Sequence, residues 1–576
     1  MKNSMSELLK VEKPSRYFPV ELNIIEKSFD KKDINVCLSY PDSYEVGMSN
    51  IGIRILYDIV KNKDGFNCDR IFAPMPDYEN MLKASKDKIT SVEYKNQLQD
   101  FDIVGFSFQY ELLYTNMLTI LDLSDISFLK EGRKEKDPFI IAGGPSLYNL
   151  SIIEKFADAI FIGEAEESLV EFIEVVKKHK NKLSRNLILQ KCAEIEGVYI
   201  PGYSKKVKRR IVEDFDNSPY PVNWIVPVSA LVHDRAYIEI MRGCQHGCRF
   251  CQAGYIYRPL RFKSLEKTIE LSDKILDSTG YEEISLASLS TSDYPYLKEL
   301  SSHIVEKYKD RKVSISLPSL RMDGETIKLL DEILKVRKTG LTFACEAGSQ
   351  HLRDCINKKI SREELFDKME EVFSKGWMTV KLYFMLGLPF EKENELEETV
   401  ELVKQCSFIA KKYGKGRASI NVAFSTFVPK PFTPFQWSKM IGIEEIKQRI
   451  GYLKENIKFK NVKLKWHNAE TSVLEGVFSR GDGKLANVII DAWKNGARFD
   501  GWSSMFKFSC WEKAFIDNNI DYKDYLNEID IESELNWDNI DICVKKSYLA
   551  EELDKASKAI HTEDCNTKSC KKCGVC

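Results

Sequence analysis

Three cysteines near the middle of the 576-residue chain have the spacing C-x3-C-x2-C, at Cys244, Cys248 and Cys251. Three thiolates on one short loop can hold three irons of a cubane iron–sulfur cluster, whose iron sites otherwise take four cysteines. The fourth iron is then open to a small molecule. Gly243 and Gly247 lie within this segment and would let the loop turn tightly. We therefore expect a [4Fe-4S] cluster at these three cysteines.

Two other uses of the three thiols remain open. Zinc ordinarily takes four protein ligands, and His246 is available, although its place inside the first spacer fits poorly. Structural burial of all three thiols is the plainer alternative. The loop follows an apolar run, however, and active sites of α/β barrels lie at the carboxyl ends of strands, which favours the cluster.

A second group of cysteines stands at the C-terminus, at Cys565, Cys570, Cys573 and Cys576. Two x2 spacings in series are typical of ferredoxin-type sites, whereas structural zinc sites more often pair two separated knuckles. The spacing leaves three alternatives: an auxiliary iron–sulfur cluster, a zinc ion, or a redox-active or disordered tail.

The composition indicates a multidomain cytosolic protein. Lys and Arg total 85 and Asp and Glu total 87, a net charge of −2 that argues against a chain wrapped in nucleic acid but leaves room for a local basic face. No apolar run approaches the roughly 18 residues that span a bilayer, and no secretory signal is recognisable. The 15 cysteines therefore predict thiols, metal ligands or catalytic groups rather than disulfides.

Alternating apolar runs and amphipathic stretches predict an α/β fold with a parallel sheet at the N-terminus and a barrel of six strands in the middle. The N-terminal strand candidates are residues 34–40, 102–110, 138–146 and 158–167. The middle candidates are residues 236–243, 282–288, 312–319, 340–349, 379–389 and 419–429. Ligands of parallel sheets sit at the carboxyl ends of the strands, where Pro41–Gly47, Gly143–Pro145 and Gly163–Glu166 are expected to line a crevice.

These patterns divide the chain into an N-terminal Rossmann-like domain (1–215), a partial (β/α)6 barrel (216–465) and a small mixed C-terminal extension (466–576). Residues 205–227 are charged and then proline-rich, and we interpret them as the connection between the first two domains. Two basic segments are each either a solvated face or a contact for nucleic acid. They are Lys205–Arg210 and the alternating Lys454, Lys458, Lys460, Lys463 and Lys465.

The segment CQHGCRFC resembles the signature of radical S-adenosylmethionine (SAM) enzymes, and the resemblance extends from about residue 236 to residue 430. Further matching segments are Ser288–Thr291, Pro318–Asp323, Glu346–Gln350 and Gly387–Pro389. The whole chain is similar to a family that joins a cobalamin-binding-like Rossmann domain to a radical SAM core and ends in CGVC. This resemblance implies a type of chemistry and leaves the substrate open.

The resemblance implies roles for five further residues. Arg321 would pair with the SAM carboxylate, because a guanidinium can hold two oxygens at once. Glu346 would accept hydrogen bonds from the SAM ribose or amine, and Ser288 and Ser290 would receive the amine. Phe250 would contact adenine. A surface ion pair for Arg321, strand-end turns for the serines and loop packing for Phe250 are the structural alternatives.

Cobalamin-binding domains of this type often carry a D-x-H-x-x-G loop, and here Pro41–Gly47 contains no histidine. Either cobalamin binds with no protein ligand below cobalt, or the fold persists without cobalamin. Tyr44 and Gln109 are candidates to face the cobalt.

The resulting hypothesis is a cytosolic radical SAM enzyme that modifies an unactivated carbon, by methyl transfer if cobalamin binds. It would take an electron from a flavodoxin or ferredoxin and act on a substrate that the sequence does not name. One alternative is cobalamin-free modification of RNA or a ribosomal component, and the other is a non-enzymatic iron–sulfur redox or assembly protein. An electron carrier would use four cysteine ligands, and this loop offers three.

We predict that Cys248→Ala abolishes both the cluster absorbance and the production of 5′-deoxyadenosine, because a cubane cannot be held by two cysteines. Anaerobic reconstitution followed by chromatography of the nucleoside product measures both. SAM cleavage by the variant at the wild-type rate would show that the site is assigned wrongly.

Overall fold

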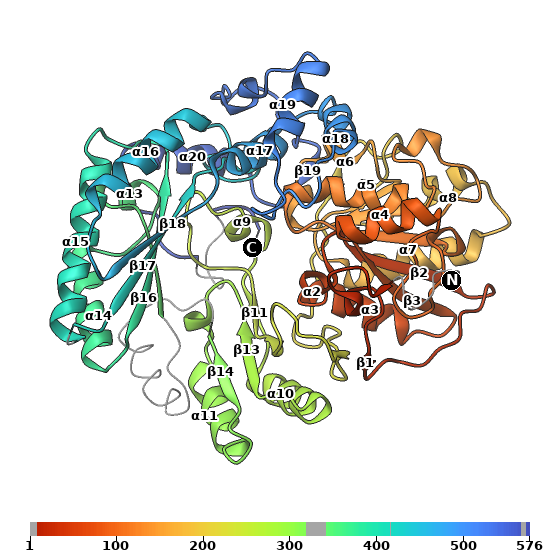
Figure 1. Cartoon of the computed structure of the whole chain (residues 1–576), viewed down its shortest axis with the longest axis horizontal. Coiled ribbons are helices and arrows are strands. Elements are labelled where there is room, and N and C mark those ends of the chain that lie inside the picture. Colours follow the sequence, from red (N-terminus) through yellow and green to blue (C-terminus); the bar gives the residue numbers. More distant parts are fainter. Residues whose placement is uncertain (1–7, 318–340, 415, 566–571, 576) are drawn as a thin grey trace.

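The computed structural model describes residues 8–317, 341–414, 416–565 and 572–575 of the chain. An N-terminal α/β unit, a middle unit of parallel strands with helices, and a C-terminal set of helices follow one another in sequence. In Figure 1 the N-terminal unit (red to yellow) lies beside the middle unit (green to cyan), and the C-terminal helices (blue) lie across both. The predicted α/β class is confirmed.

The N-terminal sheet has five parallel strands and an antiparallel edge strand, in the order β3-β2-β4-β5-β6-β7. Its strands are β2 (Ile34–Tyr40), β3 (Phe66–Phe72), β4 (Ile103–Ser107), β5 (Phe139–Gly143), β6 (Ala159–Phe161) and β7 (Val198–Tyr199). Strands β4, β5 and β6 are mostly apolar, as expected where helices cover both faces of a sheet, whereas β3 carries the buried polar residues Asn67, Asp69 and Arg70. On β2, for example, Val36 and Leu38 pack into one core and Cys37 into the other.

The topology of this sheet creates a crevice at one position. Strand β2 comes first along the chain and pairs with the second strand, β3, on one side and with the third, β4, on the other. The connections from β2 and β4 leave in opposite directions, so a crevice opens outside their carboxyl ends. Helix α3 (Ile51–Lys61) begins at this rim, where Asn50 Oδ1 accepts a hydrogen bond from the Ile53 N–H at 3.0 Å. Such a cap is worth about 1 kcal/mol.

The middle unit contains two parallel sheets. Strands β10 (Ala236–Glu239), β13 (Glu283–Ala287) and β14 (Ser314–Ser316) form the first, and helices α10 (Leu265–Thr279) and α11 (Leu297–Lys307) pack on it. Strands β15 (Leu341–Glu346), β16 (Thr379–Leu386), β17 (Ser419–Thr426) and β18 (Val462–Trp466) form the second, beside α14 (Arg362–Ser374), α15 (Glu395–Tyr413) and α16 (Ile443–Asn456).

All six predicted strands of the middle unit are present, and β18 adds a seventh. Among the described residues the two sheets are not paired with each other, and residues 318–340, which connect them, lie outside the description. The predicted alternation of lysines along one strand is correct for Lys463 and Lys465 on β18, whereas Lys454 belongs to helix α16.

The C-terminal extension ties the two units together. Helices α17 (Ala469–Arg480), α18 (Leu485–Lys494) and α19 (Phe508–Asp517) lie near the N-terminal unit, and α20 (Lys546–Ser557) near the middle unit. Asp500 accepts hydrogen bonds from Thr115 at 2.6 Å and from the Trp511 indole at 2.9 Å. The connection predicted at residues 205–227 takes part in this extension, because β8 (Val207–Lys208) pairs with β19 (Ile540–Asp541).

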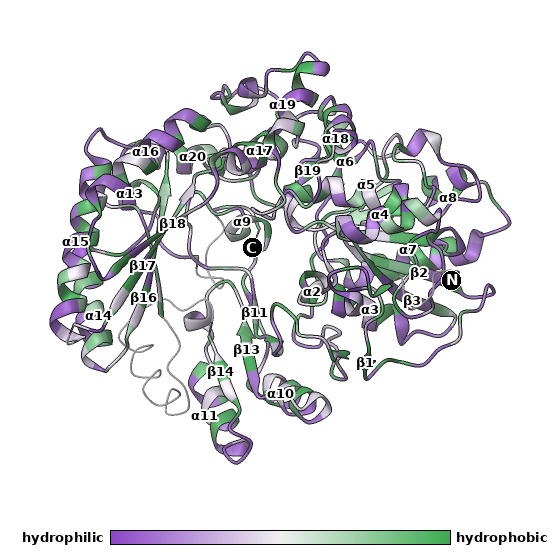
Figure 2. Cartoon of the chain, in the orientation of Figure 1, coloured by the Kyte–Doolittle hydropathy of each residue, from purple (hydrophilic) through white to green (hydrophobic). Residues whose placement is uncertain are grey.

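Hydrophobic residues are concentrated inside these units. Figure 2 shows them along the strands of the sheets, with hydrophilic residues dominating the outer loops. The indole side chains of Trp224, Trp437, Trp511 and Trp537 are among the largest fully buried groups. In the described part of the chain, no helix is both long and apolar enough to cross a membrane.

We predict that Gly144→Ala destabilises the fold. Gly144 follows β5 with φ +125°, and a Cβ there would lie 2.2 Å from the Phe108 carbonyl oxygen. Backbone strain alone costs about 1–3 kcal/mol, and the overlap adds to it. Urea denaturation measures the loss, and Gly451→Ala in α16, where a Cβ meets nothing within 4 Å, is the control. The control should gain up to about 1 kcal/mol, and equal midpoints for wild type and Gly144→Ala would contradict the argument.

Candidate active site at the cysteine loop

The three cysteines lie on a loop that two short strands close. Strand β11 (Met241–Arg242) leads into the loop, and β12 (Arg261–Phe262) pairs antiparallel with it after helix α9 (Ala253–Ile256). Gly243 has φ +89°, and a Cβ there would lie 2.7 Å from the Tyr257 carbonyl oxygen. The close return of the chain therefore requires glycine at this position, as the sequence predicts.

The loop sets the three thiols close together and partly exposed. The pKa of Cys244 is raised to about 12, mainly by burial and also by the neighbouring thiols, while the His246 N–H lowers it. Burial also raises the pKa of Cys251 to about 11, while the Gly254 N–H and the Lys358 ammonium lower it. Backbone N–H groups aimed at the sulfurs are the kind of contact that tunes iron–sulfur clusters.

The same geometry does not fit a single metal ion. Within the described ranges, no three His, Cys, Asp or Glu side chains converge closely enough to hold one ion. A cubane places each thiolate on a separate iron, so its ligands need not meet at one point. His246, the fourth ligand of the zinc alternative, lies 2.7 Å from Asp293 and 2.8 Å from Asp564 instead. Because His246 contacts two carboxylates, the zinc alternative lacks the fourth ligand that the sequence offered.

Side chains of the loop fix it to the second sheet. Arg249 is fully buried, and its guanidinium donates to the Cys355 carbonyl at 2.8 Å and lies 3.2 Å from Glu552 of α20. Phe250 packs against the apolar cluster that contains Leu352 and Leu388. This contact supports loop packing for Phe250, and a contact with adenine stays a prediction.

The residues predicted to bind SAM lie around this loop, except that Arg321 is outside the described residues. The Ser290 hydroxyl is buried without a hydrogen-bond partner in the structure, as expected of a group that awaits a ligand. Ser288 contacts the Thr291 hydroxyl at 3.0 Å. Glu346 ends β15 in the left-handed backbone region, at φ +66°, and its charge acts on the Cys251 thiol. Strain of this kind is commonly kept at functional sites.

The start of the four-cysteine tail lies against the cysteine loop. The Cys565 N–H donates to the Gln245 carbonyl at 2.7 Å, next to the contact between Asp564 and His246. Cys573 is buried, whereas Cys570 and Cys576 lie outside the described residues. A second metal site at the tail therefore stays a prediction.

A cavity of about 400 Å³ opens between the N-terminal sheet and the cysteine loop. Gly143–Pro145 and Gly163–Glu166 line it, as predicted, together with Gln109, and on the other side it reaches Met241–Gly243 and Ser288. The prediction that Pro41–Gly47 lines it is wrong. That loop is covered by the C-terminal extension, because the Trp502 indole donates to Asp42 at 3.0 Å.

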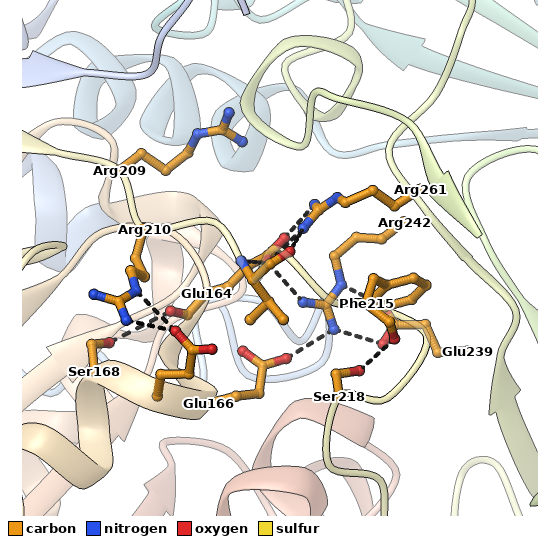
Figure 3. A network of polar contacts seen from close by, with 12 residues as sticks. Glu164, Glu166, Ser168, Arg209, Arg210, Phe215, Ser218, Glu239, Arg242 and Arg261 are labelled. Atoms are coloured by element: carbon orange, nitrogen blue, oxygen red, sulfur yellow. Dashed lines mark hydrogen bonds and ion pairs between the residues drawn. The ribbon is translucent and has the colours of Figure 1, made fainter. Parts of the chain in front are cut away.

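A network of ion pairs forms the wall that the two units share. Figure 3 shows the carboxylate of Glu164, from the loop after β6, between the guanidinium groups of Arg242 and Arg261. Arg242 lies 3.2 Å from Glu164, 2.9 Å from Glu166 and 2.7 Å from Glu239, and Arg261 lies 2.5 Å from Glu164. Burial would lower the pKa of Arg242, but these carboxylates raise it well above its usual value.

The basic run Lys205–Arg210 is not a solvated face throughout. Arg209 is fully buried and donates to backbone carbonyls of Ile256 and Arg258 near the cysteine loop. Arg210 pairs with Glu167 at 2.6 Å, at the edge of the network in Figure 3. Arg209 therefore joins the two units, whereas Arg210 pairs within the N-terminal unit, so neither is simply a solvated charge.

Two protein families match the chain. "Radical SAM proteins, N-terminal" matches residues 52–201, and "Radical SAM superfamily" matches residues 238–403, which include the cysteine loop. The chain belongs to the radical SAM superfamily. The three cysteines, the orphaned Ser290 hydroxyl and Glu346 are therefore parts of a radical SAM domain.

Similar proteins include an uncharacterized protein of Methanocaldococcus jannaschii, 27% identical over 463 residues, or 79% of this chain and 90% of that protein. A tRNA-2-methylthio-N(6)-dimethylallyladenosine synthase of Clostridium novyi is 25% identical over 277 residues, 44% of this chain and 60% of the synthase. This radical SAM protein thus spans less than two thirds of that synthase. The radical SAM methyltransferase TsrM of Kitasatospora setae, solved with cobalamin and a [4Fe-4S] cluster, gives a TM-score of 0.48 at 14% identity over 72% of this chain and 78% of its own.

Sequence reasoning missed the network of Arg242, Glu164, Glu166 and Glu239 in this radical SAM protein. The signals were present, since Arg242 directly precedes the cysteine loop and Gly163–Glu167 carries three carboxylates at a strand end. Nothing local in the sequence shows that these two segments face each other.

We predict that Arg242→Ala lowers the free energy of unfolding by about 3–5 kcal/mol, because removal of one partner leaves buried carboxylates without compensation. Chemical denaturation of the protein without cofactors measures the change. Arg311→Ala, which removes a pair with Asp277 whose side chains are 39% and 63% exposed, is the matched control. It should cost at most about 1 kcal/mol, and a similar small cost for Arg242→Ala would contradict the role of the network.

Proposed function

We propose that this radical SAM protein holds a corrinoid in the cavity between its two α/β units and transfers a methyl group to an unactivated carbon. The proposal rests on the position of the cavity, which extends from one unit to the other. It begins at Leu38 and Gly105, at the switch point of the N-terminal sheet, and reaches Arg242 and Gly243 beside the cysteine loop. A cofactor held by the first unit would therefore face the ligands of the second.

The lining of the cavity fits a large, mostly apolar cofactor. Leu38, Ile53 and Ile141 form apolar walls, and Ser107 and Gln109 add polar groups at a strand end. A corrin is a broad apolar ring edged with amides, which suits apolar walls with a few polar groups at the rim.

The loop that carries a histidine in many cobalamin-binding domains offers no ligand here. Tyr44 is fully buried and donates its hydroxyl proton to Glu21 at 2.6 Å. Burial raises the pKa of Asp42 to about 6, while hydrogen bonds from Ser43 and Trp502 lower it. No histidine is among the described residues that line the cavity. In this proposal the corrinoid has no imidazole ligand from the protein. Gln109, which lines the cavity, is the polar side chain that would take the place of the imidazole.

The cluster and SAM, when bound, supply reductive cleavage and the methyl donor, while the protein supplies position and surroundings. Cys244, Cys248 and Cys251 would hold the cluster. Ser290 offers an unpartnered hydroxyl, and Glu346 a carboxylate that accepts hydrogen bonds. An electron from a flavodoxin or ferredoxin completes the proposal.

A second candidate is modification of RNA without a corrinoid. It is supported by relatives whose names describe tRNA methylthiolation, which match 44%, 34% and 36% of this chain. In that case the N-terminal unit would be a scaffold. The two candidates differ in one measurable quantity, the cobalt content of the protein.

We predict that Gly52→Leu lowers the corrinoid content about 10-fold, the result of losing about 1.4 kcal/mol of binding free energy. Gly52 lines the cavity, and the nearest atom to a Cβ there is Asn50 Oδ1 at 3.2 Å, so the added side chain would occupy cavity space. Cobalt, iron and sulfide analysis after anaerobic purification from corrinoid-supplied cells measures the effect.

Gly451→Leu, in open space on α16, is the control and should keep its cobalt. Iron and sulfide should stay unchanged in both variants. The cob(II)alamin form of the wild type should show no nitrogen coupling from the protein in electron paramagnetic resonance. A wild-type protein that cleaves SAM yet holds no cobalt would reject the corrinoid and leave the second candidate.

A further inference from the structure

One side of the β15–β18 sheet carries exposed basic residues. Val380 and Leu382 of β16 are buried in the core with the helices, so their neighbours in the strand project from the opposite side. Pairing between strands sets residues of β17 and β18 beside them on that same side. We call the following five residues the lysine face: Lys381, Tyr383, Asn421, Lys463 and Lys465.

The lysine face concentrates positive charge that nothing in the described structure balances. Lys381, Asn421 and Lys463 stand in one row across three strands, and Lys465 lies two residues beyond Lys463. Strand geometry places Lys381 and Lys463 about 10 Å apart, and Lys463 and Lys465 about 7 Å apart. No ion pair joins these lysines to another described residue. On this side of the four strands the only acidic residue is Glu346, which lies 3.4 Å from Lys358.

An aromatic ring stands among these charges. Tyr383 is 41% exposed, beside Ala423 and one row from Lys381. Exposed lysines beside an exposed aromatic ring suit single-stranded nucleic acid, because the lysines contact phosphates and the ring stacks on a base. An acidic peptide would be attracted by the charges alone and has no use for the ring.

The lysine face leads toward the cysteine loop. Tyr383 pairs with Ala344, and after a register shift Glu346 pairs with Phe384, the residue that follows Tyr383 in β16. Glu346 lies 3.4 Å from Lys358, and the neighbouring Asn357 donates to the Gly247 carbonyl of the cysteine loop at 3.1 Å. A nucleotide next to one stacked on Tyr383 would therefore approach the candidate active site.

We propose that the lysine face binds a single-stranded nucleic-acid segment as the substrate of this enzyme, an inference that rests on the radical SAM function proposed above. The near-neutral net charge of the chain is compatible with this, because Lys381, Lys463 and Lys465 make one side of this sheet locally basic.

The test is the salt dependence of binding to full-length holoprotein. Fluorescence anisotropy would follow labelled single-stranded RNA and DNA of about 12 nucleotides, within the site sizes of single-strand binders. The triple variant Lys381→Ala, Lys463→Ala, Lys465→Ala should lower the slope of log K against log salt by about 2, at about 0.7 per phosphate contact. At 0.1 M salt, loss of these three phosphate contacts should weaken binding about 100-fold.

Two comparisons separate this from a general charge effect. The triple variant Lys31→Ala, Lys32→Ala, Lys136→Ala removes equal charge from exposed lysines of the N-terminal unit and should keep the wild-type slope. Tyr383→Ala should weaken binding about 10-fold without changing the slope, and Tyr383→Phe should restore it, because the contribution is stacking.

Equal salt slopes for the wild type and the lysine-face variant would overturn the inference. It would also be overturned if polyglutamate displaced the labelled RNA as effectively as unlabelled RNA does. A preference for RNA over DNA, or for DNA over RNA, supports the inference and identifies which nucleic acid is the substrate. Cobalt content and SAM cleavage of the wild type are measured separately. A corrinoid enzyme that binds neither nucleic acid would refute only this inference, and a nucleic-acid binder without cobalt would refute only the corrinoid.

Discussion

The buried ion pairs of Arg242 are the interaction on which the arrangement of this protein depends. Its guanidinium, 11% exposed, contacts carboxylates from both α/β units, and the first cluster cysteine follows two residues later. A buried cation requires its partners in place, because an uncompensated charge costs several kcal/mol. The orientation of the cysteine loop and the wall of the cavity are therefore set by the same contacts.

The C-terminal extension holds the opposite side of the same loop. Glu552 of α20 receives Arg249, and Asp564 receives His246, so residues distant in sequence surround the three cysteines. Trp502 and Asp500 secure the extension to the N-terminal unit. The last hundred residues thus bridge the two units, and the candidate active site is complete only when all three parts are folded together.

The electrostatics of the two proposed binding regions are opposite in character. Carboxylates and arginines neutralise each other in the wall of the cavity, which leaves mostly apolar surface for a cofactor. The lysine face has no such compensation in the described residues and is open to a polyanion. A net charge of −2 averages these regions, so charge must be read from the folded surface, where it determines what each region can bind.

Local sequence pattern was sufficient to predict the cysteine loop, the parallel strands and the loops 143–145 and 163–166. Ligand spacing and apolar runs involve only a few neighbouring residues, so the sequence shows them directly. Long-range packing decided the rest. Arg242 meets Glu166 across 76 residues, and Trp502 covers Asp42 across 460, which removes Pro41–Gly47 from the cavity that its position had predicted. Arg209 belongs to a basic run yet is buried against the cysteine loop. The partner of a charged side chain depends on which surfaces the fold brings together, and no local spacing carries that information.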